Sequence, residues 1–179
     1  MARKTLYQGK FKRFVIEGKW EFIERINCWG IVAIVAMTDD KKVILVEQHR
    51  IPVGKQVIEF PAGLADGDNG NPGETLEQAA RRELLEETGY QAQKMIFCTE
   101  GPISSASSSD VMTIFHAVGL KKVSAGGGDG TESIKVHEVP ISRIDGWLLK
   151  KAKEGLLIDS RVYGGLYLLK REVRSRESK

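Results

Sequence analysis

The chain of 179 residues is long enough for one domain with a substantial core. Hydrophobic residues make up 41% of it and charged residues 28%, which is typical of a soluble globular protein and excludes a disordered or fibrous chain. The formal net charge is only +3, and part of the basic excess lies in a tail at residues 174–179, so nucleic acid is an unlikely partner on charge grounds.

The N-terminus and the cysteines both bear on location. The opening segment, MARKTLYQGKFKRF, has no apolar signal core, and no run of the chain reaches membrane-spanning length. The two cysteines, Cys28 and Cys98, lie in separate apolar runs, which predicts buried thiols in a reducing compartment. We therefore expect a cytoplasmic protein with no membrane partner.

Residues 7–26 predict a β-hairpin ahead of the main domain. Apolar side chains alternate with charged ones at roughly period two, and Gly18-Lys19 supplies a turn. An isolated two-stranded hairpin is only marginally stable in water, so its apolar side chains need another surface to cover them. These side chains are Phe14, Ile16, Trp20 and Phe22.

The rest of the chain predicts strands and helices in an α/β (α+β) order. Residues 28–37 (CWGIVAIVAM) are continuously apolar, as in a buried central strand. Loops rich in glycine and polar residues are expected at 64–73 and 124–130. Further strands are expected at 43–47, 56–60, 94–99, 112–120 and 134–140, and helices within 74–90, 141–155 and 163–173.

One stretch, residues 74–90 (ETLEQAARRELLEETGY), carries three glutamates at helical spacing. Glu83, Glu86 and Glu87 lie three and four residues apart, so one helical face brings their carboxylates together beside Arg82. Such a cluster has two interpretations. It is either a solvated acidic face of an amphipathic helix or a site where carboxylates and substrate phosphates together bind Mg²⁺.

The order of residues in this stretch resembles the Nudix box. Residues 82–90, RELLEETGY, match its R-E-U-x-E-E-x-G-U core, in which U is a bulky apolar residue, and Glu74 stands at its upstream glutamate. The opening glycine of the box is displaced, with Gly63 as its expected equivalent eleven residues before Glu74 instead of six. We expect the extra residues to lengthen a surface loop at 64–73, since a longer loop costs little closure entropy.

The resemblance implies the Nudix fold, a mixed β-sheet sandwiched between helices, over residues 28–173. Residues 1–27 would then be a hairpin extension that joins two subunits into a homodimer. The resemblance also implies a hydrolase that depends on Mg²⁺, with Mn²⁺ able to substitute.

The resemblance assigns roles to single residues of the box. Glu83 and Glu87 would be direct metal ligands, and Glu86 a further ligand or a catalytic group. The remaining fixed residues would be structural: Glu74 and Arg82 would orient the box, and Gly89 would let the chain leave the helix.

Two further segments resemble the ADP-ribose and nucleoside-diphosphate-sugar pyrophosphatases within that family. Residues 59–63, EFPAG, match their E-[LIF]-P-A-G segment, which implies a metal-ligating backbone carbonyl at Ala62. Residues 47–50, EQHR, match their E-Q-x-R, in which the arginine contacts substrate. Without the resemblance, an ordinary surface arginine after a strand would fit equally well. The substrate-binding candidates are Arg25, Arg50 and Glu59.

The general base is expected shortly before the strand at 134–140. Relatives carry a glutamate there on a flexible loop, and the residue at that place is Glu132. The preceding Gly126-Gly127-Gly128 favours a mobile backbone. Glu132 is either the base or an additional metal ligand, and an ordinary loop acid stays open as well. The serine-rich run 104–109 replaces a substrate loop of relatives, which predicts altered selectivity for the terminal sugar.

Together these features favour hydrolysis of a small-molecule substrate, ADP-ribose or another nucleoside diphosphate sugar, to a nucleoside monophosphate and a sugar phosphate. Such a reaction depends mainly on positioning and on neutralising phosphate charge. Two alternatives are a Nudix-like module that binds nucleotide or RNA without turnover, and a Nudix hydrolase of dinucleoside polyphosphates or dNTPs. Binding modules usually lose carboxylates from the box, and none is missing here.

Overall fold

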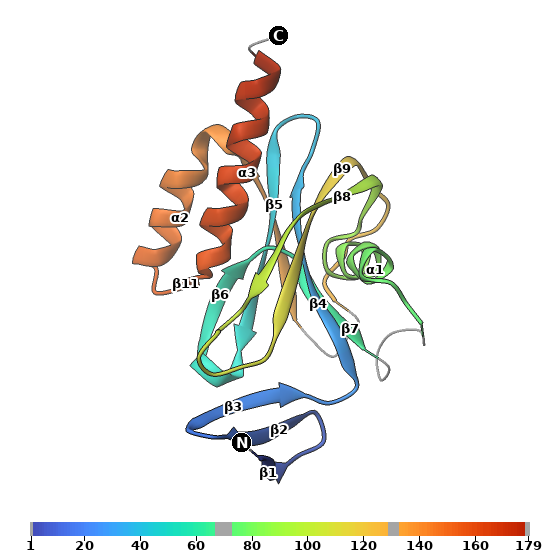
Figure 1. Cartoon of the computed structure of the whole chain (residues 1–179). Coiled ribbons are helices and arrows are strands. Elements are labelled where there is room, and N and C mark those ends of the chain that lie inside the picture. The colour runs from blue at the N-terminus through green and yellow to red at the C-terminus, as the bar shows by residue number, and fades with distance from the viewer. Residues whose placement is uncertain (1, 67–72, 129–132, 178–179) are drawn as a thin grey trace.

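A computed structural model describes residues 2–66, 73–128 and 133–177, which form a small N-terminal sheet and a larger sheet with helices on both faces (Figure 1). The strands are β1 (Arg3–Gln8), β2 (Lys12–Glu17), β3 (Trp20–Arg25), β4 (Cys28–Met37), β5 (Lys42–Arg50), β6 (Lys55–Glu59), β7 (Ala62–Asp66), β8 (Tyr90–Pro102), β9 (Val111–Lys122), β10 (Ile134–Pro140) and β11 (Leu157–Ile158). The helices are α1 (Leu76–Thr88), α2 (Ile144–Lys153) and α3 (Ser160–Glu177), with 3₁₀ turns at Ile51–Val53 and Ile141–Arg143.

The larger sheet is mixed and splits near its centre. Its strand order is β11-β6-β5-β4-β9-β8, with β10 paired to β5 and β7 paired to β4. β5 pairs with β4 only at Val43 and Ile44, and then with β6 from Val46 to Arg50. Because β4 and β6 diverge there, the chain crosses at residues 60–61 from the end of β6 to the start of β7.

The alternation of β4 explains how one strand serves two cores. Val32, Ile34 and Ala36 pack with α1, whereas Val35 packs with α2 and α3. A strand covered on both faces needs a continuous apolar run, which is the pattern of residues 28–37. Each large side chain of these cores, such as the fully buried Leu84, contributes about 2 kcal/mol by leaving water.

α3 approaches the sheet closely at Gly165. A Cβ at this position would lie 2.3 Å from the ring of Phe60 and 2.8 Å from Val35. Phe60 is the residue that leaves β6 for β7, so the first half of α3 is fixed against the segment that leads into Ala62.

The N-terminal region is a three-stranded antiparallel sheet, β1-β2-β3, whereas the sequence predicts a two-stranded hairpin. β1 escapes prediction because every one of its residues is exposed, so it has no apolar alternation. Val15 is the buried centre of this sheet. The edge strand β3 joins the connection between β8 and β9, where Ile23 N–H donates to Ser107 O and Ser109 N–H donates to Ile23 O.

Several predicted boundaries also change. Residues 64–66 belong to β7 rather than to a loop, and residues 67–72 lie outside the described part of the chain. β5 continues through Arg50, and α3 is longer than predicted at both ends. Cys28 and Cys98 are half-buried thiols rather than fully buried ones. The mixed sheet between helices agrees with the predicted α/β (α+β) class. No helix in the described ranges is long and apolar enough to cross a membrane.

Candidate active site

Capping residues fix where α1 begins and where it ends. Thr75 and Gln78 form a capping box, with Thr75 Oγ1 accepting from Gln78 N–H at 3.2 Å and Gln78 Oε1 accepting from Thr75 N–H at 2.8 Å. Gly89 ends the helix in the left-handed region, at φ 75°. Glu86 and Glu87 therefore lie in the last turn, where the helix dipole disfavours negative charge, so helix stability does not explain their position.

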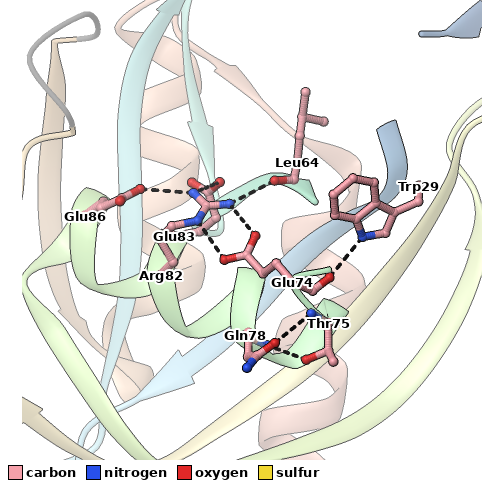
Figure 2. Close-up of polar contacts among 8 residues, drawn as sticks. All are labelled: Trp29, Leu64, Glu74, Thr75, Gln78, Arg82, Glu83 and Glu86. Atoms are coloured by element: carbon pink, nitrogen blue, oxygen red, sulfur yellow. Dashed lines mark hydrogen bonds and ion pairs between the residues drawn. The ribbon is translucent and has the colours of Figure 1, made fainter. Parts of the chain in front are cut away.

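Arg82 lies at the centre of a polar cluster on α1 (Figure 2). Its Nε and Nη2 donate to the two carboxylate oxygens of Glu74 at 3.0 and 3.2 Å, and Nη2 also donates to Leu64 O at 2.9 Å. Its Nη1 donates to Glu83 at 2.7 Å and to Glu86 at 3.1 Å. The pairing of Arg82 with Glu74 is thus present, and it ties β7 to α1.

The cluster keeps Arg82 charged. Burial opposes the charge of this guanidinium, but the carboxylates of Glu74 and Glu83 outweigh burial and raise its pKa. One guanidinium nevertheless serves three carboxylates, so negative charge is in excess among these four groups.

Glu83 and Glu87 both lie against the backbone that follows Pro61. The buried Glu87 accepts a hydrogen bond from Ala62 N–H at 3.1 Å. A Cβ on Gly63 would lie 2.0 Å from the carboxylate carbon of Glu83. A side chain at position 63 would force the Glu83 carboxylate to move, which agrees with the prediction that Gly63 is the displaced glycine of the box. The Glu59–Gly63 segment and the box glutamates therefore meet.

The donor types fit a hard divalent cation. Carboxylate oxygens from Glu83, Glu86 and Glu87 and a backbone carbonyl at Ala62 are the ligands that Mg²⁺ prefers. In the described ranges, no three His, Cys, Asp or Glu side chains are grouped closely enough to hold an ion. Arg82 instead binds the carboxylates of both Glu83 and Glu86.

Arg50 and Glu59 form a pair beside the split in the sheet. Arg50 Nε donates to Glu59 Oε2 at 2.7 Å, and Glu59 is buried. The two side chains share one face because Glu59 pairs with Val46 in the ladder between β5 and β6, four residues before Arg50.

Sequence reasoning missed Arg161, which lies 3.8 Å from Glu59 through its Nη2. Arg161 also donates to the carboxylate of Asp159 through Nε, at 2.7 Å, and through Nη2. An available signal was Asp159-Ser160, polar residues of the helix-capping kind just ahead of the apolar periodic residues of α3.

Arg25 is placed apart from the box cluster. It belongs to the end of β3 and donates through Nε to Asp110 Oδ2 at 3.2 Å, in the connection between β8 and β9. Together with the bonds of Ile23, this pair holds the N-terminal sheet against the serine-rich run.

Glu132, the candidate for the base, lies outside the described residues. Two of the glycines that precede Glu132 are hydrogen-bonded to the end of α1. Gly127 N–H donates to Glu87 O at 2.9 Å and Gly128 N–H donates to Glu86 O at 3.0 Å. These bonds satisfy carbonyls at the end of α1 that would otherwise have no helical partner. The triple glycine thus attaches to the backbone of two predicted metal ligands.

A second polar cluster, on the α2 face of the sheet, was also missed. His137 Nε2 lies 2.8 Å from Glu47 Oε2, and Lys151 Nζ lies 3.5 Å from the same oxygen. Trp147 packs edge-on to the His137 ring, with ring centres 4.9 Å apart. Burial lowers the pKa of His137 and outweighs the opposite effect of Glu47, so the imidazole is neutral near pH 7.

The chain was compared with known proteins. A family model described as "NUDIX domain" matches residues 29–155. The chain is 33% identical to an ADP-ribose pyrophosphatase of Bacillus subtilis over 65% of this chain and 64% of that protein. It is 33% identical to a methanol dehydrogenase activator of Bacillus methanolicus over 74% of this chain and 67% of that protein. It is 30% identical to a GDP-mannose pyrophosphatase of Escherichia coli O9:H4 over 82% of this chain and 75% of that protein.

A solved structure described as an ADP compounds hydrolase has the same fold. Its TM-score is 0.73 at 22% identity, and the match covers 98% of this chain and 94% of that one. The matches to several relatives span less than two thirds of their own length, 64% for the Bacillus subtilis protein and 46% for an ADP-ribose pyrophosphatase of Mycobacterium tuberculosis. The family model covers well over half of the chain, which confirms the resemblance seen in residues 74–90: the chain belongs to the Nudix family.

Proposed function

We propose that the protein is a Mg²⁺-dependent pyrophosphatase of nucleoside diphosphate sugars, with ADP-ribose among its substrates, and that it acts in the cytoplasm. One observation carries the proposal. Glu87 and Glu83 lie against the backbone of Ala62 and Gly63, and Arg82 joins Glu83 to Glu86, so carboxylates outnumber the one guanidinium among them. The likeness to pyrophosphatases of ADP-ribose and of GDP-mannose supports the substrate class.

In this proposal Glu83, Glu86, Glu87 and the Ala62 carbonyl hold the metal. When bound, the metal offsets phosphate charge and makes a water molecule more acidic. The contribution of Arg82 is geometric: it fixes Glu74 and Leu64 O and so holds β7 at a set distance from α1. Water attacks one phosphorus of the diphosphate, the P–O–P bridge breaks, and a nucleoside monophosphate and a sugar phosphate leave.

Two roles complete the proposed mechanism. Arg50 offers planar N–H donors to phosphate or base, since only its Nε is used on Glu59 among the hydrogen bonds of described residues. Glu132 serves as the general base or as an additional metal ligand.

A substrate panel tests the proposal. ADP-ribose, ADP-glucose and GDP-mannose are incubated with protein and Mg²⁺, and phosphatase then releases phosphate from the phosphomonoester products. dGTP and Ap4A are followed by chromatography, because phosphatase attacks dGTP itself. We expect comparable kcat/KM values for ADP-ribose and at least one other nucleotide sugar. A tenfold preference for dGTP or Ap4A would overturn the substrate class, and tight binding without turnover would favour a binding module.

We also infer a homodimer built through the N-terminal sheet. Its apolar side chains remain well exposed in the single chain, namely Tyr7 at 71%, Trp20 at 57% and Phe11 at 55%. Several large exposed apolar side chains on one small sheet favour an interaction surface. Light scattering at micromolar concentration should give twice the chain mass of 19.9 kDa. A monomer mass would reject the inference.

A further inference from the structure

Arg161 completes a row of four alternating charges at the start of α3. Asp159 bonds Arg161, Arg161 Nη2 lies 3.8 Å from Glu59 Oε1, and Glu59 Oε2 accepts from Arg50 Nε at 2.7 Å. Burial would raise the pKa of Asp159, but the bonds from Arg161 outweigh burial and hold that pKa below its usual value. Asp159 is therefore ionised at neutral pH beside Arg161.

The fold fixes Arg161 relative to Glu59. β11 pairs with β6 at Ile158 and Ile58, and Asp159 N–H then donates to Ile58 O at 3.0 Å. The remaining end of the guanidinium, Nη1, lies 3.5 Å from the sulfur of Met112. Met112 belongs to the small apolar cluster against which Ala62 packs, so Arg161 reaches toward the backbone of the proposed metal site.

The charge of Glu59 explains why two arginines are needed. Only 9% of its side chain is exposed, and a buried carboxylate without a counter-charge is strongly destabilising. With Arg50 as its only counter-charge, Glu59 would be left uncompensated whenever Arg50 turned toward a ligand. Arg161, although it also bonds Asp159, reduces that penalty because its Nη2 lies 3.8 Å from Glu59. The side chain of Arg50 is 36% exposed, so a ligand can reach its guanidinium.

We propose that Arg161 is a positioning residue for substrate binding: it keeps Glu59 compensated while Arg50 turns part of its guanidinium toward the diphosphate of a nucleotide sugar. The inference rests on the proposed function, in which Arg50 contacts the substrate. It adds to that function a residue from α3, outside both the Nudix box and the EQHR segment.

The test compares Arg161→Gln with the wild type in two measurements. The first is steady-state kinetics with ADP-ribose, and the second is calorimetric binding of its non-hydrolysable α,β-methylene analogue. We expect KM and Kd to rise about tenfold, as for the loss of one charged hydrogen bond, while kcat changes less than twofold. Arg161→Lys keeps the positive charge that compensates Glu59 and should stay within about threefold of the wild type. Arg143→Gln, at an exposed arginine beside α2, is the matched control and should leave both constants unchanged.

A double mutant separates compensation of Glu59 from a general structural effect. In a Glu59→Gln background the neutral amide needs no counter-charge, so Arg161→Gln should weaken binding by less than twofold further. Independent tenfold effects of the two substitutions would overturn the inference. If Arg161→Gln does not fold, a tenfold loss of affinity in a folded Arg161→Lys would overturn it too.

The outcomes also separate this inference from the proposed function. Unchanged binding by Arg161→Gln in a protein whose wild type hydrolyses ADP-ribose would refute the inference alone. A wild type that neither binds nor hydrolyses any nucleotide sugar would refute the proposed function, and the inference with it.

Discussion

α1 and α2 cover opposite faces of the same sheet, and each carries a cluster of charged side chains (Figure 1). On the α1 face, Arg82 bonds Glu74, Glu83 and Glu86. On the α2 face, Glu47 is the acceptor for one imidazole and lies 3.5 Å from one ammonium group, that of Lys151. The two clusters have similar numbers of polar groups but differ in charge.

The difference teaches which cluster is built for a ligand. Near α2 the carboxylates of Glu47 and Glu154 face the ammonium groups of Lys151 and Lys150 beside a neutral imidazole, so the charges of these groups cancel. Near α1 three carboxylates face one guanidinium, so these four groups carry a net negative charge, which the proposed metal ion would offset. The balance of charge, rather than the number of polar groups, distinguishes the candidate site.

The largest expected effect comes from Glu87→Gln. The amide oxygen can still accept from Ala62 N–H, so the fold is retained, but one charge of the proposed metal site is lost. We expect kcat for ADP-ribose to fall by on the order of 100-fold or more, the size seen when positioned charge stabilisation is removed. Glu77→Gln, on the exposed side of the same helix, should leave kcat within about twofold. Full activity of Glu87→Gln, or of the wild type in EDTA, would contradict the comparison.

The next effect is on stability, from Arg82→Met. Removing the guanidinium leaves three carboxylates together and unties Leu64 O from α1, so the free energy of unfolding should fall by about 3 kcal/mol. Because the loss is electrostatic, millimolar Mg²⁺ should recover part of it by binding the folded state. Urea unfolding with and without Mg²⁺ measures the loss in unfolding free energy and the part of it that Mg²⁺ recovers. Equal losses with and without the metal would argue against a cation site.

A smaller effect is expected from Gly126→Ala. Gly126 has φ 71°, and its Cβ would lie 2.4 Å from the carbonyl carbon of Thr88, so the substitution both strains the backbone and pushes the loop off α1. We expect a loss of about 2 kcal/mol. Gly54→Ala is the matched control, since Gly54 has φ 61° and open space around it, and should cost about 1 kcal/mol. Equal costs measured by thermal unfolding would show that the loop is not held against the helix.

The smallest effect is expected from His137→Gln, which should change how stability depends on pH but not the activity of the candidate site. The pKa of His137 is lowered in the folded protein, so between pH 7 and 5 the unfolded chain binds more protons, and stability falls as pH falls. His137→Gln should flatten this slope by up to about 1 kcal/mol over that window and leave kcat within twofold. The pKa of Glu47 is also lowered from its usual value of 4.5. Glu47 therefore changes its charge below pH 4.5 and does not contribute to the slope between pH 7 and 5. An unchanged slope, or a large loss of kcat, would contradict the division between the two clusters.

Local patterns predicted the parts of this molecule that local chemistry determines. The strand at Ile134–Pro140 has the predicted bounds. α1 lies within the predicted stretch because Thr75 and Gln78 cap its start and Gly89 ends it. The meeting of residues 59–63 with the box followed from two motifs of one family.

Features that depend on pairing between distant segments were not predictable in this way. β1 has no apolar side, and it forms a strand because it pairs with β2 through backbone hydrogen bonds. Arg161 is separated from Glu59 by about a hundred residues and meets it only because β11 pairs with β6. The anchoring of Gly127 and Gly128 was hidden because glycine-rich runs look alike whether they are loose or hydrogen-bonded to a helix end.

The attachment of β3 to the serine-rich connection has a consequence for conformational entropy. Ordering the backbone of one residue costs about 1–2 kcal/mol, and this connection would otherwise lose that freedom only when a ligand arrived. Here the backbones of Ser107 and Ser109 bond Ile23, and Asp110 bonds Arg25. The connection therefore loses its conformational entropy when the chain folds and not when a ligand binds. The N-terminal sheet thus fixes the serine-rich connection for which the sequence predicts a role in selectivity, and a substitution that loosens β3 should make binding entropically less favourable without touching any box residue.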